Sequence, residues 1–236
     1  MEDMISVLIP TRGRADKLHS LVKNIFHSSC TPDKIQVCFY VDDDDGNTLT
    51  EVKILSANFN VSCKEGPKVV FSDMWNQLLD IAEGDILMIC GDDVKFKTQK
   101  WDYFIREEFN KLPPDKIGYV CVNDEIHRGA LGVHGFVHKN WVKVLGHITP
   151  SIFTYCWADN WVDDIAKMLN RRVYLDEVVV SHEHWINHKS SFDTTYRENL
   201  ERYDRVKKET EQLYIDTLPE RKKEVELLLQ FIEENR

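Results

Sequence analysis

The sequence predicts an α/β fold in which a mixed, mostly parallel sheet is flanked by helices. Short apolar runs, typical of buried strands, alternate with segments whose apolar residues recur at helical spacing. The run of residues 86–90 is apolar at every position, as expected of a strand that is covered on both faces. These two observations together predict three layers, with helices on both sides of the sheet.

Strands and helices alternate strictly in the first half of the chain. Pro10 ends the first strand, Ser72 is placed to cap the third helix, Gly84 ends that helix, and Pro113 ends the fourth. The strands are expected over residues 5–9, 35–41, 60–64 and 86–90. The helices are expected over residues 16–28, 48–57, 72–83 and 101–109.

The alternation loosens after Pro114, and the chain ends in two charged helices. Strands are expected over residues 117–122, 132–138 and 173–181, and helices over residues 141–145 and 157–169. The charged helices occupy residues 194–236 and are separated at Pro219. An apolar stripe on the first of them predicts that it packs on the body of the protein or on a partner. We therefore expect one domain over residues 1–192 and a helical extension over residues 193–236, with a homodimer through the extension as one arrangement.

Composition narrows the class of protein. The 236 residues suffice for a substantial core, and the formal net charge of -10 argues against a broad surface that coats nucleic acid. The N-terminal segment has no basic region, and no apolar run is long enough to span a membrane. The six cysteines lack CxxC spacing, which is typical of reduced thiols. We expect a cytoplasmic protein without a membrane span.

Acidic residues follow two of the expected strands. Asp92 and Asp93 come directly after the apolar run of residues 86–90, at the end of a strand where open α/β sheets bind ligands. Adjacent carboxylates repel, so the pair indicates either a solvated turn or a site where a cation or basic group offsets the charge. In the run of four acids at residues 42–45, Gly46 favours a turn, and only Asp42 is retained as a functional candidate.

The motifs, in their order along the chain, resemble the family 2 glycosyltransferases, and in particular the small members encoded by bacteriophages. The motifs that carry the resemblance are SVLIPTRGR, FYVDDDD, a helix containing Asn76, GDILMICGDDV, WADNWVDDIAKML and VYLDEVVVSHEHW. The resemblance covers residues 5–185 and implies the GT-A (Rossmann-like) fold. It leaves the C-terminal helices unexplained.

The resemblance also implies a nucleotide-sugar site. The residues that it assigns to the nucleotide are Pro10, Thr11, Arg12, Asp42, Asn76 and Asp92. The metal motif of the family is Asp-x-Asp, and here the first acid is replaced by Gly91, while Asp93 matches the last, metal-binding position. His182 or His184 is expected to complete the metal site.

Transfer of a sugar would require a metal ion and a general base. Mn²⁺ or Mg²⁺ stabilises a departing diphosphate, and a carboxylate near the acceptor hydroxyl acts as general base. Asp159 matches the acidic position of the family, and Asp163 lies one helical turn later on nearly the same face. His127 and Arg128 are further candidates for the acceptor cleft.

Structural roles remain open for several of these residues. Asp159 also suits the positive end of a helix, and His182 and His184 also suit an exposed pair. Arg12 is suited to phosphate contacts, although it also suits a solvated loop.

The expected function is metal-dependent transfer of a sugar from a nucleotide diphosphate donor to an acceptor, with inversion at the anomeric carbon. The resemblance implies a UDP-sugar as the donor, because UDP-sugars are the usual donors in the family. The acceptor is open, and a hydroxymethylated base in phage DNA, a polysaccharide and a protein are all considered. The alternatives are a nucleotidyltransferase and a non-catalytic module that binds nucleotide sugars.

Overall fold

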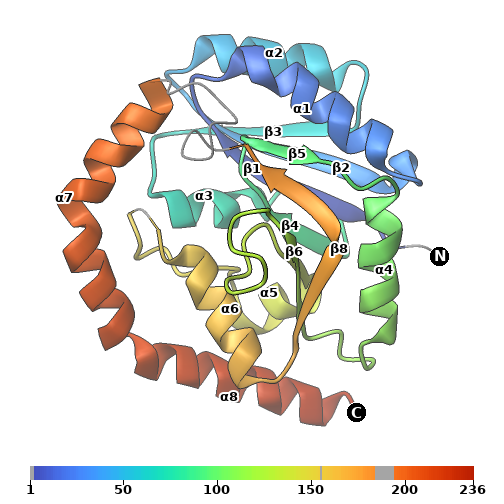
Figure 1. The fold of residues 1–236 in the computed structure, drawn as a ribbon, viewed down its shortest axis with the longest axis vertical. Helices are drawn as coiled ribbons and strands as arrows, with labels where there is room; N and C mark the ends of the chain where they lie inside the picture. The colour runs from blue at the N-terminus through green and yellow to red at the C-terminus, as the bar shows by residue number, and fades with distance from the viewer. Residues whose placement is uncertain (1–2, 155, 184–193) are drawn as a thin grey trace.

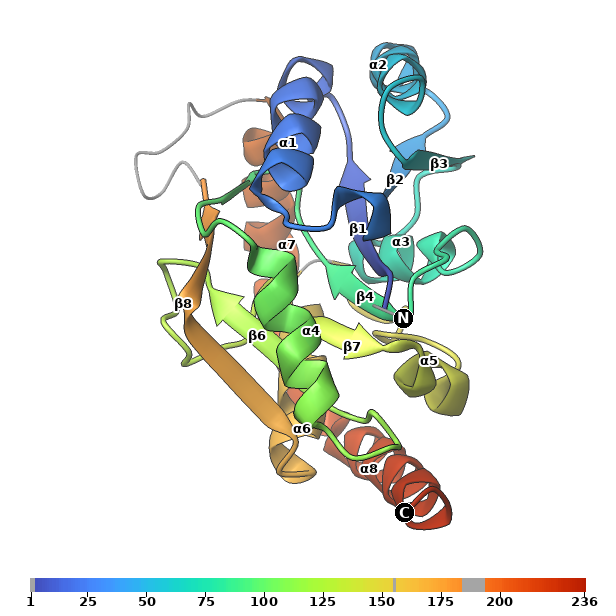
Figure 2. The same cartoon turned by 90° about the vertical axis from the view of Figure 1, so that its right-hand side faces the viewer.

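One eight-stranded sheet organises the computed structural model, which describes residues 3–154, 156–183 and 194–236 (Figures 1 and 2). The strand order is β3-β2-β1-β4-β7-β6-β8-β5. The strands are β1 (Ile5–Thr11), β2 (Ile35–Asp42), β3 (Val61–Gly66), β4 (Ile86–Ile89), β5 (Val94–Phe96), β6 (Tyr119–Asn123), β7 (Phe136–His138) and β8 (Arg172–His182). The helices are α1 (Ala15–Ser28), α2 (Gly46–Ser56), α3 (Phe71–Leu78), α4 (Trp101–Lys111), α5 (Lys139–Leu145), α6 (Ala158–Met168), α7 (Thr194–Asp216) and α8 (Leu218–Glu234).

The first four strands form a parallel half-sheet. β1 pairs in parallel with β2 and β4, and β2 pairs in parallel with β3. The intervening helices are the crossovers that parallel pairing requires. β7 then runs antiparallel to both β4 and β6, while β8 is parallel to β6 and antiparallel to β5. The carboxyl ends of β1, β2 and β4 therefore meet at one edge of the sheet.

Strand β4 is apolar throughout because it is covered on both faces. Ile86 and Met88 point into the apolar cluster shared with α1, α2 and α4. Leu87 and Ile89 point into the other cluster, which is shared with α3, α5, α6 and α8. Successive side chains of a strand alternate between faces, so both layers require an apolar residue.

Two strands differ from the sequence-based prediction. β5 has only three residues, too few for a periodicity to be visible. The strand expected over residues 132–138 begins at Phe136. The preceding loop is held in another way, since the backbone of Gly132 bonds to the side chains of Tyr119 and Asp163, and His134 has a φ of 54°.

The two C-terminal helices follow different courses. α7 runs along one edge of the molecule, and α8 continues beneath α6 (Figure 1). α8 packs against α5 and α6, and its Leu228 and Ile232 are buried in the second apolar cluster. No helix in the described ranges combines the length and apolar character that a membrane crossing needs.

Candidate active site

A pocket with a volume of about 370 Å³ opens where the parallel strands end. This volume is within the range of small-molecule sites. Its polar lining includes Thr11 at the end of β1, Arg12 after it, Asp42 of β2, Asp92 and Asp93 after β4, His182 of β8, Asp159 of α6 and Tyr196 of α7. Pro10 also lines it. The sheet thus brings together most of the residues that the sequence singled out.

The adjacent carboxylates are balanced by Arg14. Its guanidinium forms an ion pair with Asp92 and lies 3.8 Å from Asp93 Oδ2. Thr11 Oγ1 donates a second hydrogen bond to Asp92, at 2.8 Å. Burial raises the pKa of Asp92, while the charge of Arg14 works in the opposite direction. The repulsion expected from the sequence is therefore offset by a basic side chain of the loop after β1.

Asp93 has partners from two other elements. His182 Nε2 lies 3.3 Å from Oδ1, and the hydroxyl of Tyr196 donates to Oδ2 at 2.9 Å. Burial disfavours ionisation of Asp93, but the hydrogen bond and charge of His182 hold its pKa well below the usual range. Burial likewise lowers the pKa of His182, but the bond to Asp93 outweighs it and the net shift is upward. Asp93 is thus held as a carboxylate in the pocket.

Gly91, at the position where the resemblance would place the first acid of an Asp-x-Asp motif, leaves little room for a side chain. A Cβ at this position would lie 2.9 Å from Asp93 Oδ1. This distance is shorter than Cβ atoms show in real contacts. An acid at this position would therefore displace the Asp93 carboxylate.

Arg12 and Asp42, from the ends of β1 and β2, also line the pocket. Arg12 bridges Asp42, at 2.7 Å, and the exposed Asp44. The bond to Asp44 is the main cause of a raised Arg12 pKa. Asp42 is 1% exposed, and its Oδ1 has no hydrogen-bond partner within residues 3–154, 156–183 and 194–236. A buried acceptor without a partner is costly, so this oxygen is suited to a ligand N–H.

Asp159 is a carboxylate of the pocket that no described residue pairs with. It lies in the first turn of α6, lines the pocket and has no hydrogen bond or ion pair to any other residue that the structure describes. Burial raises its pKa to about 6, against the lowering effect of His182 and His127. A carboxylate with such a pKa accepts a proton readily near neutral pH.

His127 faces the same pocket and is fixed by Asp124. Asp124 is 2% exposed and lies 2.6 Å from His127 Nδ1, and it also accepts the backbone N–H groups of Ile126 and His127. The hydrogen bond to Asp124 raises the pKa of His127. The loop holds left-handed conformations at Glu125 and Arg128, on either side of the histidine.

His134 is a further histidine in the pocket wall. Its ring lies 4.9 Å from that of His182 in an edge-to-face arrangement. Burial lowers its pKa to about 3, so it is neutral at physiological pH. Its Nε2 has no hydrogen-bond partner among the residues described.

Two of the described residues that were predicted for the site, Asp163 and Asn76, do not line the pocket. Asp163 points to the sheet, where it accepts from Gly132 N and pairs with Arg172 and Lys167. Although Asp159 and Asp163 share a helix face, four residues separate them by about 6 Å along the axis, and only Asp159 reaches the strand edge. Asn76 is engaged with the backbone of Ile148 and Thr149 and links α3 to a loop. His184 lies outside the described residues.

Arg14, His134 and Tyr196 also line the pocket, although the sequence pattern did not predict them for the site. The position of Arg14 could have predicted its role, because a basic residue in the loop after β1 can reach acids at the end of the neighbouring strand β4. His134 and Tyr196 are brought to the pocket by a loop and by the C-terminal helix, and no local pattern marks them.

Comparison with known proteins gives likeness of structure only. No protein-family model matches the chain, and no curated protein matches its sequence. The mannosyltransferase PcManGT from Pyrobaculum calidifontis, solved with GDP-Man and Mn²⁺, is 17% identical, with a TM-score of 0.63 over 77% of this chain. TarS 1-349 from S. aureus, solved with UDP-GlcNAc, is 13% identical, with a TM-score of 0.59 over 75% of this chain. The chain spans 57% of the length of each. With the sheet order described above, these similarities show that the chain has the GT-A glycosyltransferase fold.

Proposed function

We propose that this protein transfers a sugar from a nucleoside diphosphate sugar to an acceptor hydroxyl. The observation that carries the proposal is the carboxylate of Asp159, which has no hydrogen-bond or ion-pair partner among the described residues and lies in the same pocket as the residues at the ends of β1, β2 and β4. A binding module has no need of a partly buried carboxylate whose pKa is raised. A nucleotidyltransferase has no need of a base at this position.

The donor nucleotide is assigned to the wall formed by β1 and β2. Asp42 Oδ1 is buried, has no hydrogen-bond partner in the part of the chain that the structure describes, and would accept an N–H of the base, while Arg12 and Thr11 lie beside it. Uracil offers such a group at N3, and guanine offers N–H groups on its pairing edge. We propose a UDP-sugar as the donor, with a GDP-sugar as the second choice, since PcManGT was solved with GDP-Man.

The possible metal ligands Asp93 and His182 are spaced as a divalent ion would require. Asp93 Oδ1 and His182 Nε2 are 3.3 Å apart, and two adjacent ligands on an octahedral ion with bonds of about 2.1 Å lie about 3 Å apart. No group of three His, Cys, Asp or Glu gathers around one point in the described part of the chain. Mg²⁺ often keeps several waters, however, and needs few protein ligands. Bound there, Mn²⁺ or Mg²⁺ would offset the charge of the departing diphosphate.

Asp159 is the proposed general base. The acceptor hydroxyl gives its proton to the Asp159 carboxylate while its oxygen forms a bond to the anomeric carbon. The bond from that carbon to the diphosphate oxygen breaks, and the electron pair leaves with the diphosphate. Direct displacement of this kind inverts the anomeric configuration. Arg14 contributes a fixed positive charge at the diphosphate end of the pocket.

The pH dependence of transfer should report the proposed base. Because Asp159 must be ionised to accept a proton and burial raises its pKa to about 6, kcat/KM should fall by about tenfold per unit below that pH. An exposed aspartate would produce this fall near pH 4. The measurement is a pH profile of transfer, and a profile that stays flat down to about pH 4 would contradict the assignment of Asp159.

Replacement of Asp93 tests the metal site. We expect Asp93→Ala to weaken Mn²⁺-dependent UDP binding by at least about 100-fold, because a direct ligand should cost no less than a residue that orients one. Calorimetric titration with UDP, with and without Mn²⁺, measures this effect. Asp43→Ala is the matched control, since Asp43 is an exposed acid outside the pocket. Equal Mn²⁺ dependence in wild type and Asp93→Ala would contradict the metal assignment.

The products distinguish the three classes of function. A panel of UDP- and GDP-sugars with Mn²⁺ should yield the free nucleoside diphosphate, slowly with water and faster with the correct acceptor. Release of pyrophosphate would indicate a nucleotidyltransferase, and binding without turnover by any acceptor would indicate a module. The acceptor screen would begin with DNA that contains hydroxymethylated bases, followed by polysaccharide and protein acceptors.

A further inference from the structure

Tyr196 connects the C-terminal helix α7 to the candidate active site. It lies in the first turn of α7, is 3% exposed, and donates a hydrogen bond of 2.9 Å to Asp93 Oδ2. It lines the main pocket and also a second cavity of about 330 Å³ beside α1. The ring therefore forms part of the wall between the two spaces, next to the carboxylate assigned to the metal.

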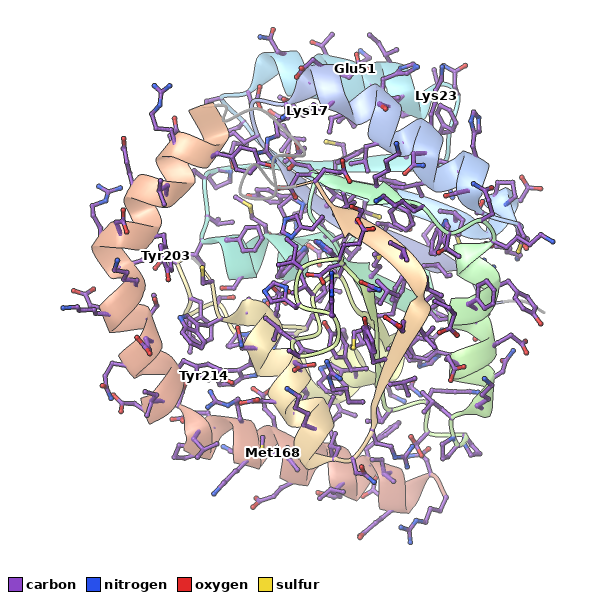
Figure 3. All side chains as sticks on the ribbon, in the orientation of Figure 1. Lys17, Lys23, Glu51, Met168, Tyr203 and Tyr214 are labelled. Atoms are coloured by element: carbon purple, nitrogen blue, oxygen red, sulfur yellow. The ribbon has the colours of Figure 1, made fainter. Side chains whose placement is uncertain are left out.

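The ring of Tyr196 also packs against the basic side of the pocket. The guanidinium carbon of Arg14 lies 4.3 Å from the ring centroid, and Lys17 Nζ lies 5.8 Å from it. Lys17 of α1 is labelled in Figure 3. A guanidinium above an aromatic face is attracted by the ring electrons and is restricted in orientation. Arg14 itself pairs with Asp92 and lies near Asp93, so one tyrosine contacts both kinds of charged group at this end of the pocket.

We propose that Tyr196 is a positioning residue for the diphosphate end of the donor. Its hydroxyl orients the Asp93 carboxylate toward the metal, and its ring holds Arg14 in place for the diphosphate. Residues that orient a ligand of a metal typically contribute about 10–100-fold to metal affinity. This inference rests on the proposed function and extends it to α7, which the sequence resemblance does not cover. Because binding and docking are linked, a bound donor should in turn stabilise the contact between α7 and the sheet edge.

Two substitutions separate the hydroxyl from the ring. Tyr196→Phe removes the hydroxyl, with its hydrogen bonds to Asp93 and to the backbone carbonyl of Glu183, whereas Tyr196→Leu also removes the aromatic face beneath Arg14. We expect Tyr196→Phe to lose about 10–100-fold in Mn²⁺-dependent UDP affinity and to keep its metal-free UDP affinity. Tyr196→Leu should weaken both. Tyr203→Phe is the matched control, because Tyr203 is 38% exposed on the same helix (Figure 3) and does not line the pocket.

The measurement is calorimetric titration of the full chain with UDP, with and without Mn²⁺. A residue that only packs would not change one affinity while leaving the other intact, so the difference between the two affinities is decisive. If wild type binds UDP and both Tyr196 variants bind it equally well, the inference is overturned and the proposed function stands. If wild type binds neither UDP nor GDP, the proposed function fails and the role of Tyr196 fails with it. Should Tyr196→Leu not fold, Tyr196→Phe alone carries the test, since it retains the ring.

Discussion

Replacement of Asp159 with asparagine should lower the rate of sugar transfer by about 10²–10⁴-fold, the range over which a general base contributes. Asparagine has nearly the same shape but cannot accept the proton of the acceptor hydroxyl. Since Asp159 bonds to no other described residue, the substitution should leave the fold intact. UDP affinity should be unchanged, because Asp42, Arg12 and Asp93 remain in place. The measurement is kcat for transfer, with UDP binding measured on the same sample.

Asp164 provides the control on the same helix. It does not line the pocket. Its carboxylate instead accepts a hydrogen bond from the hydroxyl of Tyr214 and lies 3.4 Å from Arg221. Asp164→Asn should therefore retain the wild-type transfer rate. Retention of transfer by Asp159→Asn would remove this residue from the role of base and direct attention to His127, a second possible proton acceptor in the pocket, which Asp124 orients.

Replacement of Asp163 with asparagine should instead lower stability. Its side chain is 1% exposed, and it pairs with Arg172, whose side chain is 14% exposed, and with Lys167 at 2.5 Å. Removal of one partner leaves a largely buried charge without compensation, and such changes cost about 3–5 kcal/mol in the free energy of unfolding. Urea unfolding followed by circular dichroism measures the loss.

A paired substitution separates this effect from catalysis. Replacing Asp163 and Arg172 together with apolar residues should cost less than Asp163→Asn alone, because neither charge is left unpaired. At temperatures where the variant is folded, Asp163→Asn should transfer sugar at the wild-type rate. A large loss of transfer without a loss of stability would restore Asp163 as a catalytic residue, as the helical spacing first predicted.

The sequence contained enough information to predict most of the sheet. The alternation of buried strands with amphipathic segments correctly predicts β1, β2, β4 and the helices between them. A strand that is buried on both faces has apolar residues at nearly every position, which makes it visible in the sequence. The expected strand over residues 132–138 is only partly right, since side chains from β6 and α6 hold residues 132–135 as a loop. These contacts are distant in sequence, and hydrophobic periodicity does not report them.

The same limit applies to the pocket. Residues at the ends of strands or shortly after them, such as Thr11, Asp42 and Asp93, were predictable because parallel strands present their carboxyl ends at one edge. Tyr196 depends on where α7 docks, and His134 on a left-handed backbone in a loop. Asp163 shows the converse error. Asp159 and Asp163 lie on the same face of α6 but in different environments. Asp159 lines the pocket, whereas Asp163 contacts Gly132 and Arg172.

The burial of α8 has a consequence for biosynthesis. Leu228 and Ile232 belong to the same apolar cluster as Leu8, Leu87 and Ile89. The first strand is made early, yet the surface that covers this side of the sheet is not complete until α8 has emerged from the ribosome. Until α8 has been synthesised, the nascent chain therefore carries part of this apolar face uncovered, and during that time the exposed part is available to trigger aggregation or to recruit chaperones.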